Sequence, residues 1–173
     1  MKKIQNVIYF TEGQNEEKLI KVLKTEMKCL IPGKTECLNV LTHKITNGRM
    51  MALMPHTTVV MVFDTDVDCP LEILNANIKA LNEYPSVDNV ITVPQVKTIE
   101  DELVYSTDIK AVTKLLPSSS NKAFKSDFNR MADGNLAAKL KSHGFDISKL
   151  WSRNPGGEFS SYYNDTGIIK ILL

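Results

Sequence analysis

The sequence is poor in the residues that build zinc sites and disulfide frameworks, with three cysteines and three histidines among 173 residues. Cys29, Cys37 and Cys69 are odd in number and show no CxxC spacing, so we expect reduced, structural thiols. The histidines are scattered without the spacing of metal ligands, and we expect ordinary surface or core residues. The sequence therefore gives no sign of a zinc centre or of a disulfide-stapled chain.

Long apolar runs and a complete P-loop are also missing. No run approaches the ~20 residues that a membrane span needs, so we expect no membrane association. The first six residues turn polar before a signal peptide's apolar core could form, which favours a cytoplasmic protein. Gly33-Lys34-Thr35 matches the end of a P-loop, but Lys28 stands where the motif's first glycine would be.

The charge is unevenly distributed along a chain whose length suits one domain with a small appendage. Residues 1–109 carry 11 Lys/Arg and 15 Asp/Glu, a balance of −4, whereas residues 110–153 carry 9 and 3, a balance of +6. This pattern hints at a metal site beside a surface for a polyanion. A solvated basic helical face explains the second part equally well.

The apolar stretch Val59–Phe63 runs directly into three acidic residues at alternate positions, Asp64, Asp66 and Asp68. A short apolar run without polar alternation is typical of a strand buried on both faces of a parallel sheet. Its C-terminal end would place Asp64 in the crevice where open α/β sheets bind ligands. The three carboxylates would repel one another there unless a cation joined them, so this stretch predicts half of a divalent-metal site.

A second strand end supplies candidates for the other half. Residues 6–10 predict the first strand, and Glu12-Gly13 follows it, where glycine permits a tight turn. Residues 16–24 then predict a helix, with Glu16 in its first turn. Glu12 therefore stands at a strand end and Glu16 near the start of the next helix.

The alternation of strands and helices predicts an α/β fold with a mostly parallel sheet of about four strands, flanked by helices. We place this unit at residues 1–97 and a basic, helical extension packed on it at residues 98–173, with a soft boundary. We expect strands at 6–10, 37–41, 59–63 and 89–93 and helices at 16–24 and 71–84. In the extension we expect helices from 99, at 108–116, 122–131, 134–142 and 146–151, and a strand or helix at 168–173.

The combination of Glu12-Gly13 after the first strand with Asp64-Thr65-Asp66 after the third resembles the Toprim domain. The resemblance covers roughly residues 4–97 and implies a Toprim-like, Rossmann-like fold. Thr11-Glu12-Gly13-Gln14-Asn15-Glu16-Glu17 is most similar to nucleases of the overcoming-lysogenization-defect group. Residues 62–68 are also similar to the ribonuclease that matures 5S ribosomal RNA. Cys69-Pro70 departs from the glycine that many members carry shortly after the second aspartate.

The resemblance implies a Mg²⁺- or Mn²⁺-dependent nuclease that acts on DNA or RNA, with no small-molecule cofactor. It assigns Glu12 as general acid/base and Asp64 and Asp66 as metal ligands. Glu16 and Asp68 are further candidate ligands, although a surface acid and a helix-capping residue are equally good descriptions of them. A protein partner is a further expectation, because the basic extension is small for a substrate clamp.

Basic residues of the second part would contact the nucleic acid backbone. Lys122, Lys125 and Arg130 lie on one predicted helix. Lys97, at the end of the first part, follows the fourth strand and could also contact a phosphate, although an exposed loop lysine is the simpler interpretation. Further candidates are Lys139, Lys141 and Arg153. Glu100, Asp101 and Glu102 we interpret as a solvated helix start. No motif for reading base sequence is present, so we expect recognition of shape or backbone.

Three other functions compete with a nuclease. The first is a Toprim-like module that binds nucleic acid or a protein partner without cutting. The second is a haloacid-dehalogenase-type phosphatase, because Asp64-Thr65-Asp66-Val67 fits its nucleophile motif, although no paired Asp follows downstream. The third is a receiver-type phosphorylation domain, which needs paired acids where this chain has Glu12-Gly13.

Overall fold

A computed structural model of the chain describes residues 6–172. The segment from which we expect no export, residues 1–6, lies outside the described residues except for Asn6. Within residues 6–172, no helix has both the length and the apolar character that a membrane crossing requires.

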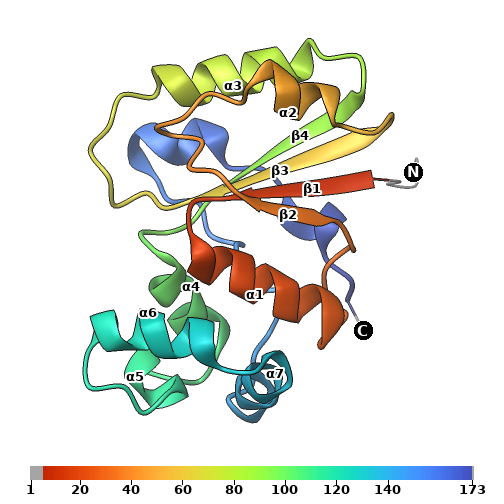
Figure 1. Cartoon of the computed structure of the whole chain (residues 1–173). Helices are drawn as coiled ribbons and strands as arrows, with labels where there is room; N and C mark the ends of the chain where they lie inside the picture. The colour runs from red at the N-terminus through yellow and green to blue at the C-terminus, as the bar shows by residue number, and fades with distance from the viewer. Residues whose placement is uncertain (1–5, 173) are drawn as a thin grey trace.

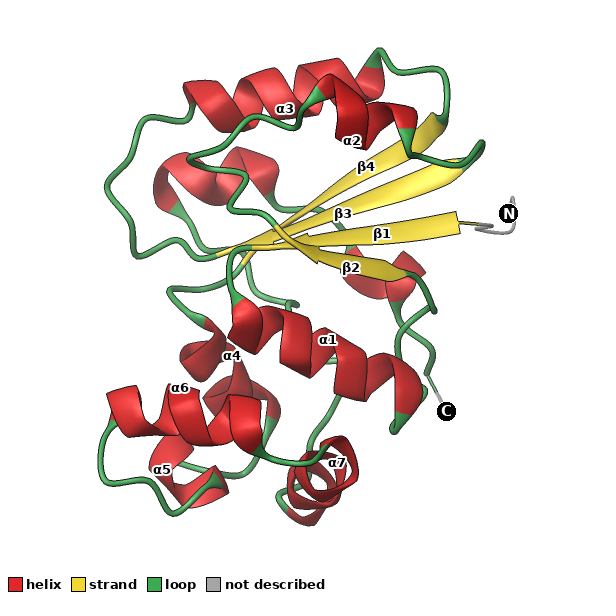
Figure 2. Ribbon diagram, in the orientation of Figure 1, coloured by secondary structure: helices red, strands yellow, loops and turns green. Residues whose placement is uncertain are grey.

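Four parallel strands form one sheet in the order β2-β1-β3-β4, as Figure 1 and Figure 2 show. Their bounds are β1 Asn6–Thr11, β2 Lys34–Cys37, β3 Thr57–Phe63 and β4 Val87–Pro94. All seven residues of β3 are buried, as expected for an apolar strand with a neighbour on each side. The predicted α/β fold with a parallel, four-stranded sheet is confirmed.

The helices lie between and after the strands. They are α1 Gln14–Thr25, α2 Asn47–Met51, α3 Glu72–Asn82, α4 Ile99–Ser106, α5 Val112–Leu115, α6 Asn121–Arg130 and α7 Asp133–Ser142. Two 3₁₀ helices follow, η1 Gly157–Tyr162 and η2 Thr166–Ile169. Several predicted bounds are wrong: the helix expected at 108–116 shortens to α5, and residues 146–151 form turns. The expected last element becomes η2 and an isolated antiparallel bridge between Lys170 and Leu30, with Leu173 outside the described part.

The second strand was predicted three residues too late. The prediction followed the apolar residues at 37–41, but the strand is the polar segment Lys34–Cys37 at the edge of the sheet. The pairing ends just beyond it, where the backbone N–H of Leu38 donates to the carbonyl of Thr11 at 2.8 Å. Leu38, Val40 and Leu41 are buried in a loop that covers the sheet, so their side chains serve the core without joining a strand.

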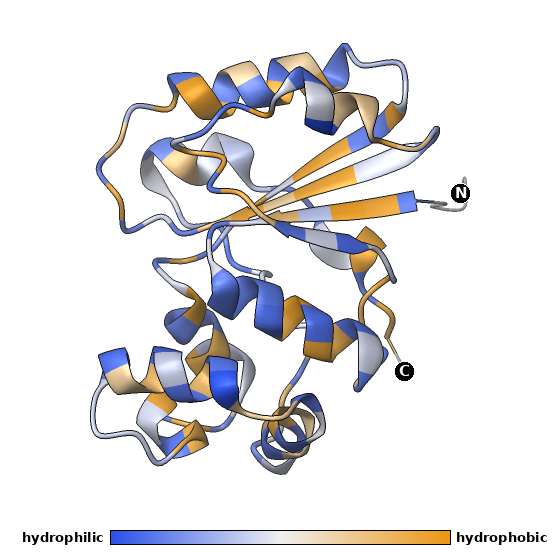
Figure 3. Ribbon diagram, viewed as in Figure 1, coloured by the Kyte–Doolittle hydropathy of each residue, from blue (hydrophilic) through white to orange (hydrophobic). Residues whose placement is uncertain are grey.

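The connections after β1 and β3 cover opposite faces of the sheet. Helices α1 and α4 to α7 pack on one face, and α3 with η1 packs on the other, as Figure 1 shows for α1 and α3. Alternate residues of β1 accordingly enter different cores: Val7 and Tyr9 face α1, while Ile8 and Phe10 face α3. Figure 3 shows apolar colour along much of β1, β3 and β4, hydrophilic colour on β2 and mixed colour on α1. Because the chain leaves β1 and β3 in opposite directions, a crevice for ligands is expected between their carboxyl ends.

The extension completes the core on the α1 face. Phe124 and Phe128 of α6 and Leu136 of α7 are fully buried in one cluster with Leu19 and Leu23 of α1. The two phenylalanine rings lie 5.4 Å apart between centroids. Phe124 and Phe128, four residues apart, therefore form the inward face of α6.

Glu102 is buried, and its hydrogen bonds join α4 to two other segments of the chain. Its side chain is 1% exposed, so the solvated helix start predicted at 100–102 is wrong for this residue. Its carboxylate accepts from the backbone N–H groups of Val96 at 2.9 Å and Trp151 at 3.1 Å, and from Arg153 Nη2 at 3.1 Å. Arg153 also lies 4.2 Å above the ring of Tyr105. Arg153 therefore has a structural role, and its phosphate contact stays a prediction.

We expect Glu102→Ala to lower the free energy of unfolding by about 3 kcal/mol, because it leaves two backbone donors and one guanidinium without their buried acceptor. Urea unfolding followed by circular dichroism measures the loss. Glu83→Ala, at an exposed position just after α3, is the matched control and should change stability by less than about 0.5 kcal/mol. Equal effects of the two substitutions would contradict the structural role of Glu102.

Candidate functional site

The carboxyl ends of β1, β3 and β4 bring together Glu12, Asp64 and Gln95. The Oε2 atom of Glu12 accepts from the backbone N–H of Asp64 at 3.0 Å. The Nε2 atom of Gln95 donates to Oδ1 of Asp64 at 2.9 Å. Because β3 lies between β1 and β4, Asp64 is held from both sides. The two acids that carried the sequence-based prediction are therefore neighbours in the crevice between β1 and β3.

Gln95 links the ends of β3 and β4 and was missed by the sequence analysis. It is fully buried, and its backbone N–H donates to the carbonyl of Phe63 at 2.8 Å. The hydroxyl of Thr65 donates to the carbonyl of Gln95 at 2.7 Å and accepts from the N–H of Lys97 at 3.1 Å. The buried Oε1 of Gln95 has no hydrogen-bond partner among residues 6–172. Its position directly after β4 was the signal that would have found it.

Carboxylates crowd this edge of the sheet. Burial first, and then the nearby carboxylates of Glu16 and Glu12, together raise the pKa of Asp64 to about 8. Glu16, in the first turn of α1, is 5% exposed, and burial followed by the charge of Glu12 raises its pKa. Asp64 therefore holds a proton near neutral pH unless a positive charge offsets its neighbours.

The predicted ligands do not form one assembled cluster. Asp66 and Asp68 are exposed on the loop that follows β3. Within the part of the chain that the structure describes, no three Asp, Glu, His or Cys side chains are grouped closely enough to hold a metal ion. Mg²⁺, however, usually binds one or two carboxylates and keeps several waters, with substrate phosphates as further ligands. The oxygen donors of Glu12 and Asp64 fit Mg²⁺ or Mn²⁺ in kind, without forming a closed cage.

A pocket of about 350 Å³ opens at these acids. It is lined by Glu12, Gly13, Gln14, Asn15, Glu16, Asp64, Lys125 and Asn129. The start of α1 therefore forms one wall, and α6 of the extension forms the opposite wall. Asn129 Nδ2 donates to Oδ1 of Asn15 at 2.6 Å and joins the two walls. Backbone N–H groups at the start of a helix favour anions, so the pocket presents both acids and a feature suited to phosphate.

Among the predicted phosphate-binding residues, Lys125 is the one that lines this pocket. Its Nζ lies 3.4 Å from Oε1 of Glu100. Burial lowers the pKa of Lys125, but Glu100, Asp64 and Glu16 outweigh this effect and raise it overall, so the ammonium stays charged. Lys122 and Arg130 are exposed at the two ends of α6, and Lys97 is exposed after β4 with a positive φ of 66°. The structure does not place these three residues in the pocket.

No family model matches the chain, and no curated protein or solved structure shows significant similarity to it.

We expect Asp64→Asn to stabilise the metal-free protein. Between about pH 4 and about pH 8 the folded protein holds a proton on Asp64 that the unfolded chain releases, so stability falls as the pH rises. Asparagine removes this loss and keeps an Oδ1 atom for Gln95. Urea unfolding with a chelator should show the variant more stable near pH 8, by on the order of 2 kcal/mol, and equally stable near pH 4. A variant less stable at both values would contradict this reasoning.

Proposed function

We propose that the protein is a Toprim-type, Mg²⁺-dependent nuclease that acts on DNA or RNA. The observation that supports this best is the contact between Glu12 and Asp64 at the crevice between β1 and β3. Acids from two strand ends, a helix start and a lysine share one open pocket. This combination suits a phosphodiester, which needs its negative charge neutralised and a water molecule activated.

The charged residues in and near the pocket have proposed parts in that reaction. Asp64 would hold the divalent cation, with Asp66 from the same loop, and the cation supplies charge neutralisation and activation of water. Glu12 would accept a proton from the attacking water or return one to the leaving oxygen. Lys125 and the first N–H groups of α1 would hold the phosphate oxygens. Glu16 and Asp68 remain candidate ligands.

A second candidate is a module of the same type that binds nucleic acid, or a protein partner, without cutting. The absence of an assembled three-residue metal group among residues 6–172 favours it. The use of one Glu12 oxygen in a bond to the backbone of Asp64 favours it too. A phosphatase of the haloacid-dehalogenase type has less support, because the residue directly after the neighbouring strand β4 is Gln95, an amide and not an acid.

Cleavage of labelled DNA and structured RNA, with Mg²⁺, Mn²⁺ or a chelator, tests the first proposal. We expect metal-dependent cleavage that falls at least ~100-fold in Glu12→Gln and in Asp64→Asn, because each removes a group that acts in the transition state. Glu83→Gln removes a carboxylate near the opposite ends of the strands and should leave the rate unchanged.

Two other results would contradict a nuclease site at Glu12 and Asp64. Cleavage that persists in both site variants comes from another centre or from a contaminant. Salt-sensitive binding without cleavage, retained by both variants, supports the non-cutting module.

Binding at varied salt separates Lys125 from the other lysine of α6. We expect Lys125→Gln to weaken binding of single-stranded nucleic acid and to lower the slope of log K against log salt by about 0.7, which corresponds to one lost phosphate contact. Lys122→Gln, on the same helix but outside the pocket, should change the slope less. A larger effect of Lys122→Gln would move the binding surface away from the acidic pocket.

A further inference from the structure

Gln95 is bonded to three consecutive residues at the end of β3. Its backbone N–H donates to the carbonyl of Phe63 at 2.8 Å, and its carbonyl accepts from the hydroxyl of Thr65 at 2.7 Å. Its side-chain Nε2 donates to Oδ1 of Asp64, the residue between these two, at 2.9 Å. One residue therefore fixes both the backbone around Asp64 and one oxygen of its carboxyl group.

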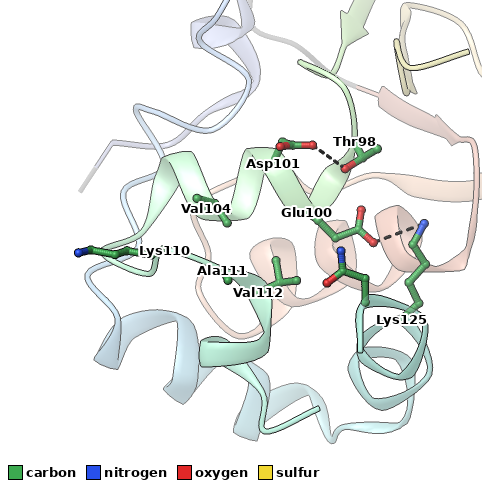
Figure 4. Close-up of a pocket in the computed structure, with 9 residues that line it drawn as sticks. Thr98, Glu100, Asp101, Val104, Lys110, Ala111, Val112 and Lys125 are labelled. Atoms are coloured by element: carbon green, nitrogen blue, oxygen red, sulfur yellow. Dashed lines mark hydrogen bonds and ion pairs between the residues drawn. The ribbon is translucent and has the colours of Figure 1, made fainter. Parts of the chain in front are cut away.

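The segment that carries Gln95 is anchored on both sides. Before Gln95, strand β4 pairs with β3 along its length. After Gln95, the backbone N–H of Val96 donates to the buried Glu102 at 2.9 Å. At the start of α4, the hydroxyl of Thr98 donates to Asp101 at 3.0 Å, as Figure 4 shows. The side chain of Gln95 therefore extends from a backbone that is held in place, which suits a residue that supports a functional group.

The amide of Gln95 contributes little to the stability of the core. The side chain is fully buried, and its one hydrogen bond among residues 6–172 is the bond to Asp64, because Oε1 has no partner there. A buried acceptor without a partner costs about 1–3 kcal/mol, and an apolar side chain of similar length would avoid this cost. Asn77, a buried amide of α3, instead uses both ends of its amide in three hydrogen bonds. The amide of Gln95 therefore acts on Asp64 more than on the fold.

The bond from Gln95 leaves Asp64 one oxygen for a ligand. Its Oδ2 atom makes no hydrogen bond within residues 6–172, and Asp64 lines the pocket that opens at Glu12. A carboxylate with one oxygen engaged can coordinate a cation through the other oxygen, as in the sites of Mg²⁺. Ca²⁺ is larger, takes more oxygen ligands and often binds both oxygens of one carboxylate. The number of free oxygens on Asp64 therefore affects which cation is preferred.

We propose that Gln95 is a positioning residue that restricts Asp64 to coordination through one oxygen and thereby favours Mg²⁺ or Mn²⁺ over Ca²⁺, an inference that rests on the cation site of the proposed function. Gln95 acts through Asp64 without touching the cation. Its amide presents Nε2 to the carboxylate, because Oε1 would be repelled there. Hydrogen bonds behind a ligand typically change metal affinity by about 10–100-fold.

Mn²⁺ binding to the full chain, followed by electron paramagnetic resonance with Ca²⁺ as a competitor, tests this role without nucleic acid. Gln95→Met keeps the length of the side chain and removes the donor. We expect it to weaken Mn²⁺ binding about tenfold and to lower the ratio of Mn²⁺ to Ca²⁺ affinity by on the order of fivefold. Protonation of Asp64 does not alter this ratio, because both cations compete with the same proton.

Thr65→Val is the matched control. It removes the hydroxyl that donates to the backbone of Gln95 and leaves the bond between the Gln95 side chain and Asp64. A loosened backbone should weaken both cations alike, so the ratio should change less than about twofold. Asp64→Ala identifies the Mn²⁺ bound at this site. Thermal unfolding verifies that each variant folds, and Gln95→Leu takes the place of Gln95→Met if that variant does not.

An unchanged ratio in Gln95→Met, or an equal change in Thr65→Val, would overturn the proposal, and so would the lack of any Mn²⁺ binding that depends on Asp64. These measurements do not involve cleavage, so they separate the two proposals. A ratio that falls in Gln95→Met alone, in a protein that cuts no nucleic acid, upholds the positioning role and rejects the nuclease. Metal-dependent cleavage that needs Asp64, with an unchanged ratio in Gln95→Met, upholds the nuclease and rejects the role of Gln95.

Discussion

The candidate site depends on the parallel pairing of β1 with β3. This pairing places Glu12 and Asp64 at one edge, where the carboxylate of the first accepts from the backbone of the second. It also sends α1 and α3 to opposite faces, which opens the crevice between the two strand ends. A shift of one residue in register would exchange the faces on which the β3 side chains lie and separate the two acids. The register of β1 against β3 therefore determines both which side chains enter the core and which acids meet at the site.

Two glutamates of α4 show how similar sequence positions acquire different roles. Glu102 accepts from three partners in two segments, around Val96 and around Trp151, and links both to α4. Glu100, half a turn away, is buried with charge nearby but without hydrogen bonds. Burial of a carboxylate stabilises a fold only where its acceptors are used, so Glu102 contributes more to stability than Glu100 does.

The sequence was sufficient to predict the strands that carry the site, because apolar runs such as Val59–Phe63 followed by Asp64 have a local pattern. It failed for β2, since the edge strand is polar while the apolar residues after it pack from a loop. It also failed for Gln95, Glu100 and Glu102, whose roles arise from contacts with residues far along the chain. The sequence did not distinguish Lys125 from several other lysines, because its place at the pocket depends on how Phe124 and Phe128 pack and thereby orient α6. Periodicity predicts which face of a helix is buried, but not which neighbour its other faces meet.

The packing of helix α6 limits where this chain could be cut or fused to another protein. Its phenylalanines cover leucines of α1, and its lysine and Asn129 form one wall of the acidic pocket. An α/β unit cut after residue 97 would keep every acid of the strand ends, yet it would lose the cation opposite them and expose apolar surface on α1. The unit is therefore not a transplantable module. Insertions or fusions that keep the fold must preserve the packing of α6 on α1, although α6 lies more than a hundred residues after Glu12 in the chain.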